Sequence, residues 1–184
     1  GVSERTVYRD IRDLSLSGEK QGLESVIDAA LQLSEHPWMF VIVGQGGGKA
    51  RLEKMAQQRG LRNMQFFPLQ SYDALPALLK MGDCHLVVQK RGAADAVLPS
   101  KLTNILAVGG NAVITAEAAT ELGQLCNSYP GIAVCVEPES VPALVTGIEQ
   151  ALAMPKENTV AREYAERTLE KENVLSQFIA DIRG

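Results

Sequence analysis

The sequence predicts an α/β fold, a Rossmann-like parallel sheet with helices on both faces. Short, wholly apolar runs such as 39–43 alternate with amphipathic helical segments, and the connections between them are short. An uninterrupted apolar run is typical of a strand buried on both faces. Strands that alternate with helices join as right-handed βαβ units. The length of 184 residues and the 46% hydrophobic content fit one globular domain.

The expected elements follow one another with the periodicity of each type. Leu23 to Leu31 has apolar residues every three or four positions, which predicts a helix. The strand over 39–43 stops at Gly44. The later expectations are a helix over 52–60, a strand over 64–67, a helix over 75–79, a strand over 84–89, a helix over 101–108, a strand over 111–115, a helix over 120–129, a strand over 132–136 and a helix over 141–152.

The segment after Pro155 is charged and is expected to be helical, packing across the helices of the sheet. Its last part has an apolar face made of Leu175, Phe178, Ile179 and Ile182. Pro155 itself ends the preceding helix.

Composition excludes several classes of function. Eighteen Lys and Arg against 22 Asp and Glu give a net charge of −4, which argues against nucleic acid as a partner. No apolar run approaches the length of a membrane span, so a cytoplasmic protein is expected. His85 and the three cysteines, Cys84, Cys126 and Cys135, have no metal-ligand spacing and are expected to be core residues.

A glycine-rich loop, Gly44-Gln-Gly-Gly-Gly-Lys49, lies between a predicted strand and a predicted helix. Backbone N–H groups at such a helix start favour phosphate. The loop matches neither the Walker A motif nor the dinucleotide motif, because Ala50 and Lys49 replace required residues. It is therefore either a flexible turn or a loop that faces a nucleotide diphosphate.

A second candidate is Leu98-Pro-Ser-Lys-Leu102, which precedes another predicted helix. Ser100 is a candidate N-cap, and Lys101 with the exposed N–H groups could hold a diphosphate. The alternative is capping alone, with Lys101 in solvent. Lys90 and Arg91 follow a strand and either bind an anion or are solvated.

Several segments in a fixed order carry a family resemblance. They are Gly18-Glu-Lys-Gln-Gly22, Val43-Gly-Gln-Gly-Gly-Gly-Lys49, Phe66-Phe-Pro-Leu-Gln70, Met81-Gly-Asp-Cys84 and Leu98-Pro-Ser-Lys-Leu102. Residues 18–184 resemble the C-terminal, donor-binding half of the family 4 retaining glycosyltransferases of the GT-B fold, in particular those that build the exopolysaccharide colanic acid. The resemblance covers about nine tenths of the chain.

The resemblance implies a nucleotide sugar as donor, GDP-fucose for the colanic acid enzymes, with no cofactor and no catalytic metal. The acceptor would be a lipid-linked sugar at the inner membrane, to which the whole enzyme would be peripheral. The residues implied to contact the donor are Lys20, Gly46, Gly47, Ser100 and Lys101 at the diphosphate and Leu69 and Gln70 beside the base.

The sequence departs from the family at the sugar site. Many members carry two glutamates eight positions apart, and the matching positions are Ala96 and Asn104. Asp95 is adjacent to the first. Asp95 and Asn104 are therefore the candidate sugar contacts, and no catalytic residue is identified.

Residues 1–17 differ from the rest. They resemble the recognition helix of a helix-turn-helix regulator, with Ser3 as N-cap, and their charges balance. We interpret them as a foreign or atypical segment before a donor-binding domain at 18–184, with a crude strand at Leu14–Leu16 as the other outcome.

The family's acceptor-binding half is not in the sequence, so the chain alone is expected to transfer no sugar. Two other functions stay open: a DNA-binding regulator fragment that uses residues 3–14, and an assembly module that forms a homodimer.

Overall fold

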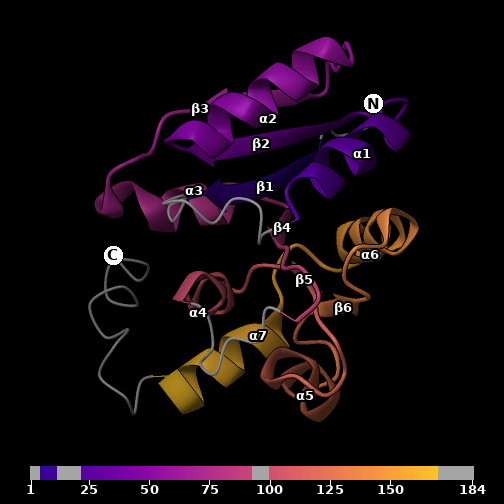
Figure 1. Cartoon of the computed structure of the whole chain (residues 1–184). Coiled ribbons are helices and arrows are strands. Elements are labelled where there is room, and N and C mark those ends of the chain that lie inside the picture. Colours follow the sequence, from indigo (N-terminus) through magenta and orange to yellow (C-terminus); the bar gives the residue numbers. More distant parts are fainter. Residues whose placement is uncertain (1–4, 12–21, 93–99, 170–184) are drawn as a thin grey trace.

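The computed structural model describes residues 5–11, 22–92 and 100–169 of the chain. Six parallel strands form one sheet in the order β3-β2-β1-β4-β5-β6 (Figure 1). The strands are β1 (Arg5–Ile11), β2 (Trp38–Gly44), β3 (Met64–Phe67), β4 (Cys84–Val87), β5 (Ala112–Thr115) and β6 (Val134–Val136). The predicted α/β class with a parallel sheet is confirmed.

Helices cover both faces of the sheet (Figure 1). They are α1 (Glu24–Gln32), α2 (Gly47–Gln58), the short η2 (Tyr72–Ala74), α3 (Leu75–Met81), α4 (Ser100–Ala107), α5 (Glu121–Ser128), α6 (Val141–Ala153), α7 (Thr159–Tyr164) and the π-helical turn η3 (Ala165–Leu169). Every helix predicted up to residue 153 is present, and the helical expectation after Pro155 is confirmed over 159–169. The apolar face predicted at Leu175–Ile182 lies outside the described residues.

The sheet has a separate apolar core on each face because successive strand residues point in opposite directions. Phe40 and Ile42 of β2 pack with α1, α2 and α6. Val43 of the same strand, with Val87 of β4 and Ile114 of β5, packs with α3, α4, α5 and α7. The two cores explain why these strands have apolar residues at consecutive positions.

Residues 5–11 form the central strand β1, so the recognition helix predicted within 1–17 is wrong for this part. Arg5 pairs with Trp38 and Ile11 with Gly44 along β2, and Val7 pairs with Cys84 of β4. Without β1, the facing edges of β2 and β4 would leave buried N–H and C=O groups unpaired. That tertiary demand outweighs the local helical pattern. Ser3 and the strand expected over 14–16 lie outside the described residues.

Asp83 connects three separate segments at the amino-terminal edge of the sheet. Its carboxylate accepts a hydrogen bond of 2.8 Å from the N–H of Thr6 and one of 2.7 Å from Lys156. Burial alone would raise the pKa of Asp83, but the bonds from Lys156 and Thr6 outweigh it and hold the pKa below the usual value. The pairing fixes β1 against the segment before α7.

Asn158 fixes α7 to the body of the domain, and its side chain is 5% exposed. Its Oδ1 accepts from the N–H of Ala161 at 3.0 Å, which caps the helix. Its Nδ2 donates to the carbonyls of Gly131 at 2.9 Å and Ile132 at 3.3 Å. Because α7 packs on α4, the cap also supports the helix that begins at Ser100.

Replacing Asn158 by alanine is expected to lower the free energy of unfolding by about 2 kcal/mol, from the lost cap and the carbonyls left unpaired. Asn158→Asp retains the oxygen that caps the helix but lacks the N–H donor, so its free energy of unfolding should fall by less than that of Asn158→Ala. Urea unfolding followed by circular dichroism measures both. Equal stability of Asn158→Ala and the wild type would contradict the role given to this side chain.

Within 5–11, 22–92 and 100–169, no helix is both long and apolar enough to span a bilayer.

Candidate functional site

The crevice for a ligand is expected where neighbouring parallel strands send their connections to opposite faces of the sheet. β1 and β4 are such neighbours. The helices α1 and α2 belong to one core, and α4, which follows β4, belongs to the other. The loops after β1 and β4 approach each other, because a Cβ at Gly22 would lie 3.5 Å from Cγ of Lys90. The candidate site is therefore at the carboxyl edge of the sheet.

The glycine-rich loop presents open backbone at this edge. Gly46 has φ 90° and precedes α2 without any side-chain cap. This φ lies in the region that favours glycine. A Cβ on Gly47 would meet nothing within 4 Å, so the first turn of α2 faces open space. Its N–H groups are available to an anion from the ligand side.

The start of α4 is the second group at this edge. α4 is described from Ser100 onward, and Ser100 is exposed. Thr103 donates a hydrogen bond of 2.8 Å from its hydroxyl to the carbonyl of Ser100. Lys101 is half-buried, and Leu102 beside it is 0% exposed, which anchors the turn in the core. Asn104, one turn later, is half-buried.

Leu69 and Gln70 follow β3 at the same edge, beside the loop after β2. Both are half-buried, and Gln70 donates from Nε2 to the carbonyl of Pro68 at 2.8 Å. This bond within the loop holds the Gln70 side chain close to its own backbone.

The structure brings Gly46, Gly47, Ser100 and Lys101 to one edge of the sheet, as the sequence predicted. Because β1 lies between β2 and β4, the axes of β2 and β4 are about 10 Å apart. The helices that follow β2 and β4 pack on opposite faces of the sheet, so their starts lie on either side of β1. Lys20 and Asp95 lie outside the described residues. The binding roles of all these residues stay predictions.

Arg91 is not a free cation at this edge. Its guanidinium forms ion pairs with Glu117 at 3.2 Å, Glu137 at 2.8 Å and Glu139 at 3.9 Å. Three carboxylates outnumber the single positive charge, so the arginine holds the loops after β4, β5 and β6 together. Sequence reasoning missed this cluster, because its members are far apart along the chain.

The core role expected of the other titratable residues is confirmed only in part. His85 and Cys84 are both 0% exposed. Cys135 is exposed and Cys126 is half-buried, so the core expectation is wrong for Cys135. β6 is short and lies at the sheet edge, where one side of the strand has no neighbour.

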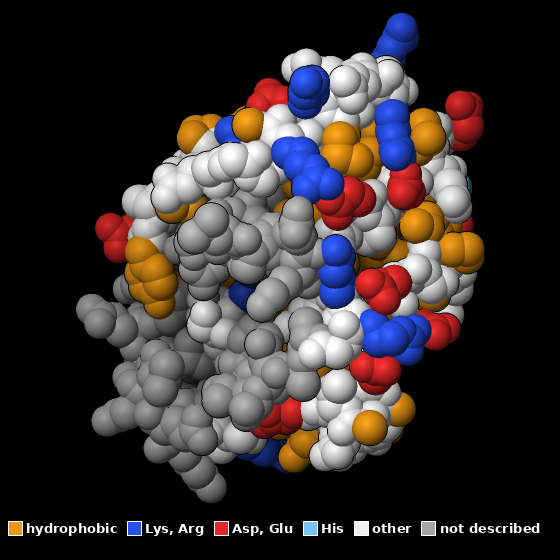
Figure 2. Space-filling model, in the orientation of Figure 1, with side chains coloured by type: hydrophobic (Ala, Val, Ile, Leu, Met, Phe, Trp, Pro, Cys, Tyr) orange, Lys and Arg blue, Asp and Glu red, His pale blue; other side chains and the backbone are white. Residues whose placement is uncertain are grey.

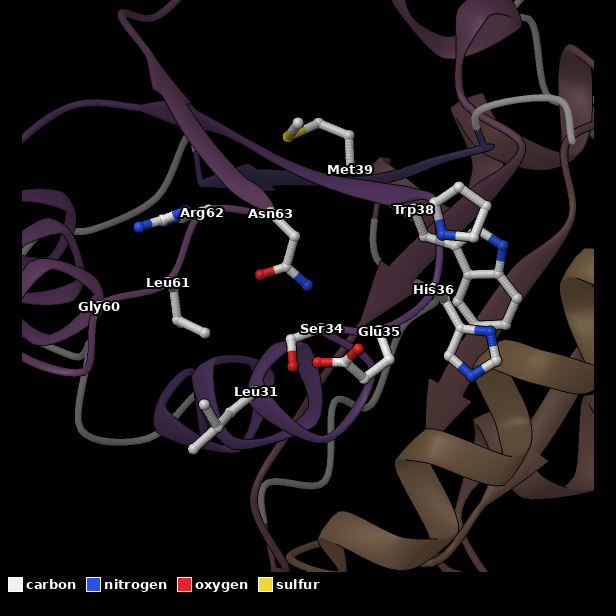
Figure 3. A pocket seen from close by; sticks show the side chains of 11 residues that line it. Leu31, Ser34, Glu35, His36, Trp38, Met39, Gly60, Leu61, Arg62 and Asn63 are labelled. Atoms are coloured by element: carbon white, nitrogen blue, oxygen red, sulfur yellow. The ribbon is translucent and has the colours of Figure 1, made fainter.

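A separate cavity of about 520 Å³ opens at the opposite, amino-terminal edge (Figure 3). It lies between the start of β2 and the ends of α1 and α2, and its wall includes Leu31, Trp38, Leu61 and Arg62. His36 stacks on Trp38 with ring centroids 4.2 Å apart. The cavity contains none of the predicted donor contacts.

The charges on the surface are mixed. Figure 2 shows basic and acidic side chains interspersed over the described part of one face, without a single basic field. Among the residues that the structure describes, no three His, Cys, Asp or Glu side chains are grouped to hold a metal ion.

Comparison with known proteins gives matches over most of the chain. The model of the family named Glycosyl transferases group 1 matches residues 16–168. A protein of Escherichia coli (strain K12), provisionally named colanic acid biosynthesis glycosyl transferase WcaI, is 86% identical over 167 residues. These residues are 91% of this chain and 41% of that protein, so the chain spans about two fifths of the relative's length.

Two solved structures have the same fold. A glycosyltransferase from Rickettsia africae ESF-5 aligns with TM-score 0.72 and 14% identity, over 98% of this chain and 49% of its own. Anabaena Alr3699/HepE, solved in complex with UDP-glucose, aligns with TM-score 0.69 and 17% identity, over 98% and 48%.

Proposed function

Because the chain belongs to the group 1 glycosyl transferases, we propose that it forms the donor-binding half of a retaining enzyme of the GT-B fold. The observation that carries the proposal is the location of two helix starts, at Gly46 and Ser100, on the same carboxyl edge of a sheet with this family's fold. A nucleotide sugar fits this edge, since its diphosphate carries the charge that helix N-termini favour.

The proposed chemistry places the diphosphate between the starts of α2 and α4. When the sugar is transferred, negative charge develops on the departing nucleoside diphosphate. The N–H groups of Gly47 and its neighbours, together with the Lys101 ammonium, stabilise that charge electrostatically. Leu69 and Gln70 lie beside the base, Lys20 adds a second cation, and Asp95 and Asn104 contact the sugar. The transfer proceeds without a metal ion or a cofactor.

The proposed donor is GDP-fucose, and the proposed acceptor is a lipid-linked sugar at the cytoplasmic face of the inner membrane. The 86% identity to a relative named for colanic acid biosynthesis supports this assignment. A related fold that holds UDP-glucose supports the broader class of nucleotide sugar. The chain spans 41% of the length of that colanic acid relative, and the proposed role of these residues is to bind the donor without transferring sugar by themselves.

Calorimetry with GDP, GDP-fucose and UDP-glucose tests the proposal. Lys101→Ala should weaken GDP binding by about tenfold or more, because a charge-assisted bond to phosphate contributes roughly 1.5–3 kcal/mol. Lys54→Ala is the matched control, since Lys54 is exposed further along α2, away from its first turn. It should bind GDP as the wild type does.

Three results would overturn parts of the proposal. If a folded sample shows no heat of binding with any of the nucleotides, the proposal that the chain binds a donor is wrong. If Lys101→Ala and Lys54→Ala lose the same affinity for GDP, the proposal of a diphosphate site at α4 is wrong. Sugar transfer by the isolated chain contradicts its inactivity.

A further inference from the structure

Lys90 and Arg91 are consecutive basic residues in the loop after β4, but their surroundings differ. The Arg91 guanidinium is paired with three carboxylates. Lys90 is half-buried, and its ammonium group forms no ion pair or hydrogen bond with any residue of 5–11, 22–92 or 100–169. Because buried charges in proteins are normally paired, a half-buried cation without such a partner is a candidate to bind an anionic ligand.

The backbone on either side of Lys90 is held in place by hydrogen bonds to the next loops. The N–H of Gln89 donates to the hydroxyl oxygen of Thr115 at 2.6 Å, and that hydroxyl donates to the carbonyl of Gln89 at 2.8 Å. On the other side, the N–H of Gly92 donates to the carboxylate of Glu117 at 3.4 Å. The backbone position of Lys90 is therefore fixed before a ligand arrives, which lowers the entropic cost of binding.

The Lys90 side chain lies against the turn that leads into α1. A Cβ placed on Gly22 would lie 3.5 Å from Cγ of Lys90 and 3.6 Å from Val88. Gly22 has φ 59°, a conformation that favours glycine, so the methylene stem of Lys90 packs against bare backbone. The Gly22 carbonyl accepts from the N–H of Ser25 at 3.1 Å and from its hydroxyl at 2.5 Å, so both lone pairs of this oxygen are already used.

This stem lies at the point of the sheet where a ligand is expected to bind. β1 and β4 are adjacent strands whose connections lead to opposite faces of the sheet (Figure 1). The loops that follow these two strands approach each other at Gly22 and Lys90. Partial burial weakens screening by solvent, so a cation here attracts an anion more strongly than a fully exposed lysine does.

We propose that Lys90 is a further residue that binds the diphosphate of the donor, in addition to Lys101. This inference rests on the donor site proposed above, and it adds a positive charge from the loop after β4 to the one from α4. The Lys90 ammonium neutralises part of the negative charge that develops on the departing nucleoside diphosphate, so it favours both binding and departure of that group.

Calorimetry with inorganic pyrophosphate and with GDP tests the role of Lys90. Lys90→Met removes the charge but keeps an apolar stem against Gly22, so it should weaken the binding of both ligands about tenfold. Lys54→Met is the matched control, because Lys54 is exposed and lies beyond the first turn of α2, and it should bind both ligands as the wild type does. Lys90→Arg restores a positive charge and should recover most of the lost affinity.

A second measurement needs no variant. Acetylation of the folded wild type by an amine-reactive reagent, followed by peptide mass spectrometry, gives the reaction rate of each lysine. Saturating GDP should slow the acetylation of Lys90 severalfold and leave that of Lys54 unchanged.

The outcomes separate this proposal from the proposed function. If the wild type and Lys90→Met bind GDP equally, or if GDP leaves Lys90 as reactive as before, the role of Lys90 is wrong and the donor site at Lys101 still stands. If the wild type binds pyrophosphate but not GDP, and Lys90→Met loses that binding, the anion site is supported and the nucleotide sugar is the wrong ligand. If the folded wild type binds neither ligand, both proposals are wrong.

Discussion

Gly123→Ala is expected to be among the most damaging single substitutions in the part of the chain that the structure describes. A Cβ at this position would lie 2.3 Å from the carbonyl oxygen of Glu117 and 2.8 Å from Cα of Ala118. Both atoms belong to the backbone, so no side-chain rotation relieves the clash. The loop after β5 and the first turn of α5 must separate, which should lower the free energy of unfolding by roughly 3 kcal/mol or more.

Gly47→Ala is the matched control, since a Cβ there would meet nothing within 4 Å. Its stability should equal or exceed that of the wild type, because alanine in a helix is favoured over glycine by roughly 0.5–1 kcal/mol. Thermal unfolding of both variants gives the comparison. Similar Tm values for Gly123→Ala and Gly47→Ala would show that the loop adjusts freely, contrary to the packing described.

Acid should destabilise the protein through His85. Burial lowers the pKa of His85 to about 4, against an opposing hydrogen bond with the backbone of Leu79 that raises it. An unfolded chain binds this proton near pH 6.5. The unfolded state therefore holds more protons between these values, and stability is lost as the pH falls from about 6.5 toward 4. Linkage over that interval amounts to roughly 3 kcal/mol.

Urea unfolding of the wild type and His85→Gln at several pH values isolates this contribution. The difference between the two proteins should shrink or reverse in favour of the variant as the pH falls from 6.5 to 4, and it should then level off. Asp83 acts in a lower window: its pKa is held below 3.8, so the stability it contributes is present above that value and is lost as the pH falls further. A pH-independent difference between the wild type and His85→Gln would contradict a neutral, buried imidazole.

The sequence predicted correctly those elements whose cap, apolar face and end are all determined by residues close together along the chain. The helix over 141–152 is an example. Ser140 accepts the N–H of Ala143 at 3.3 Å as its cap, apolar residues recur on one face, and the helix ends at Ala153 before Pro155. No distant segment is needed to explain it, so the prediction was correct to within about two residues.

The central strand could not be predicted in this way. Residues 5–11 mix charged, polar and apolar side chains without a strict alternation, so the sequence lacks the period-two pattern that would mark a strand. Only the facing edges of β2 and β4, supplied by residues far along the chain, make the extended conformation the stable one.

The sequence could predict at which edge of the sheet the candidate site lies, but not which side chains contact one another there. Parallel topology places the loops after every strand together, which is why Gly46 and Ser100 share one side of the molecule. The ion pairs of Arg91 depend on the exact paths of loops that begin at Glu117 and Glu137. Ion pairs between such loops leave no periodic pattern in the sequence, so they could not be predicted from it.

The position of β1 also bears on how the chain folds. The hydrogen bonding of the sheet passes from β2 to β4 only through this strand, and Thr6 meets Asp83 across 77 positions of sequence. Contacts of such long separation form slowly. Until β1 inserts, two partial sheets each expose an open edge that accepts a strand from another molecule. Aggregation during refolding should therefore compete most strongly before the amino-terminal strand has docked.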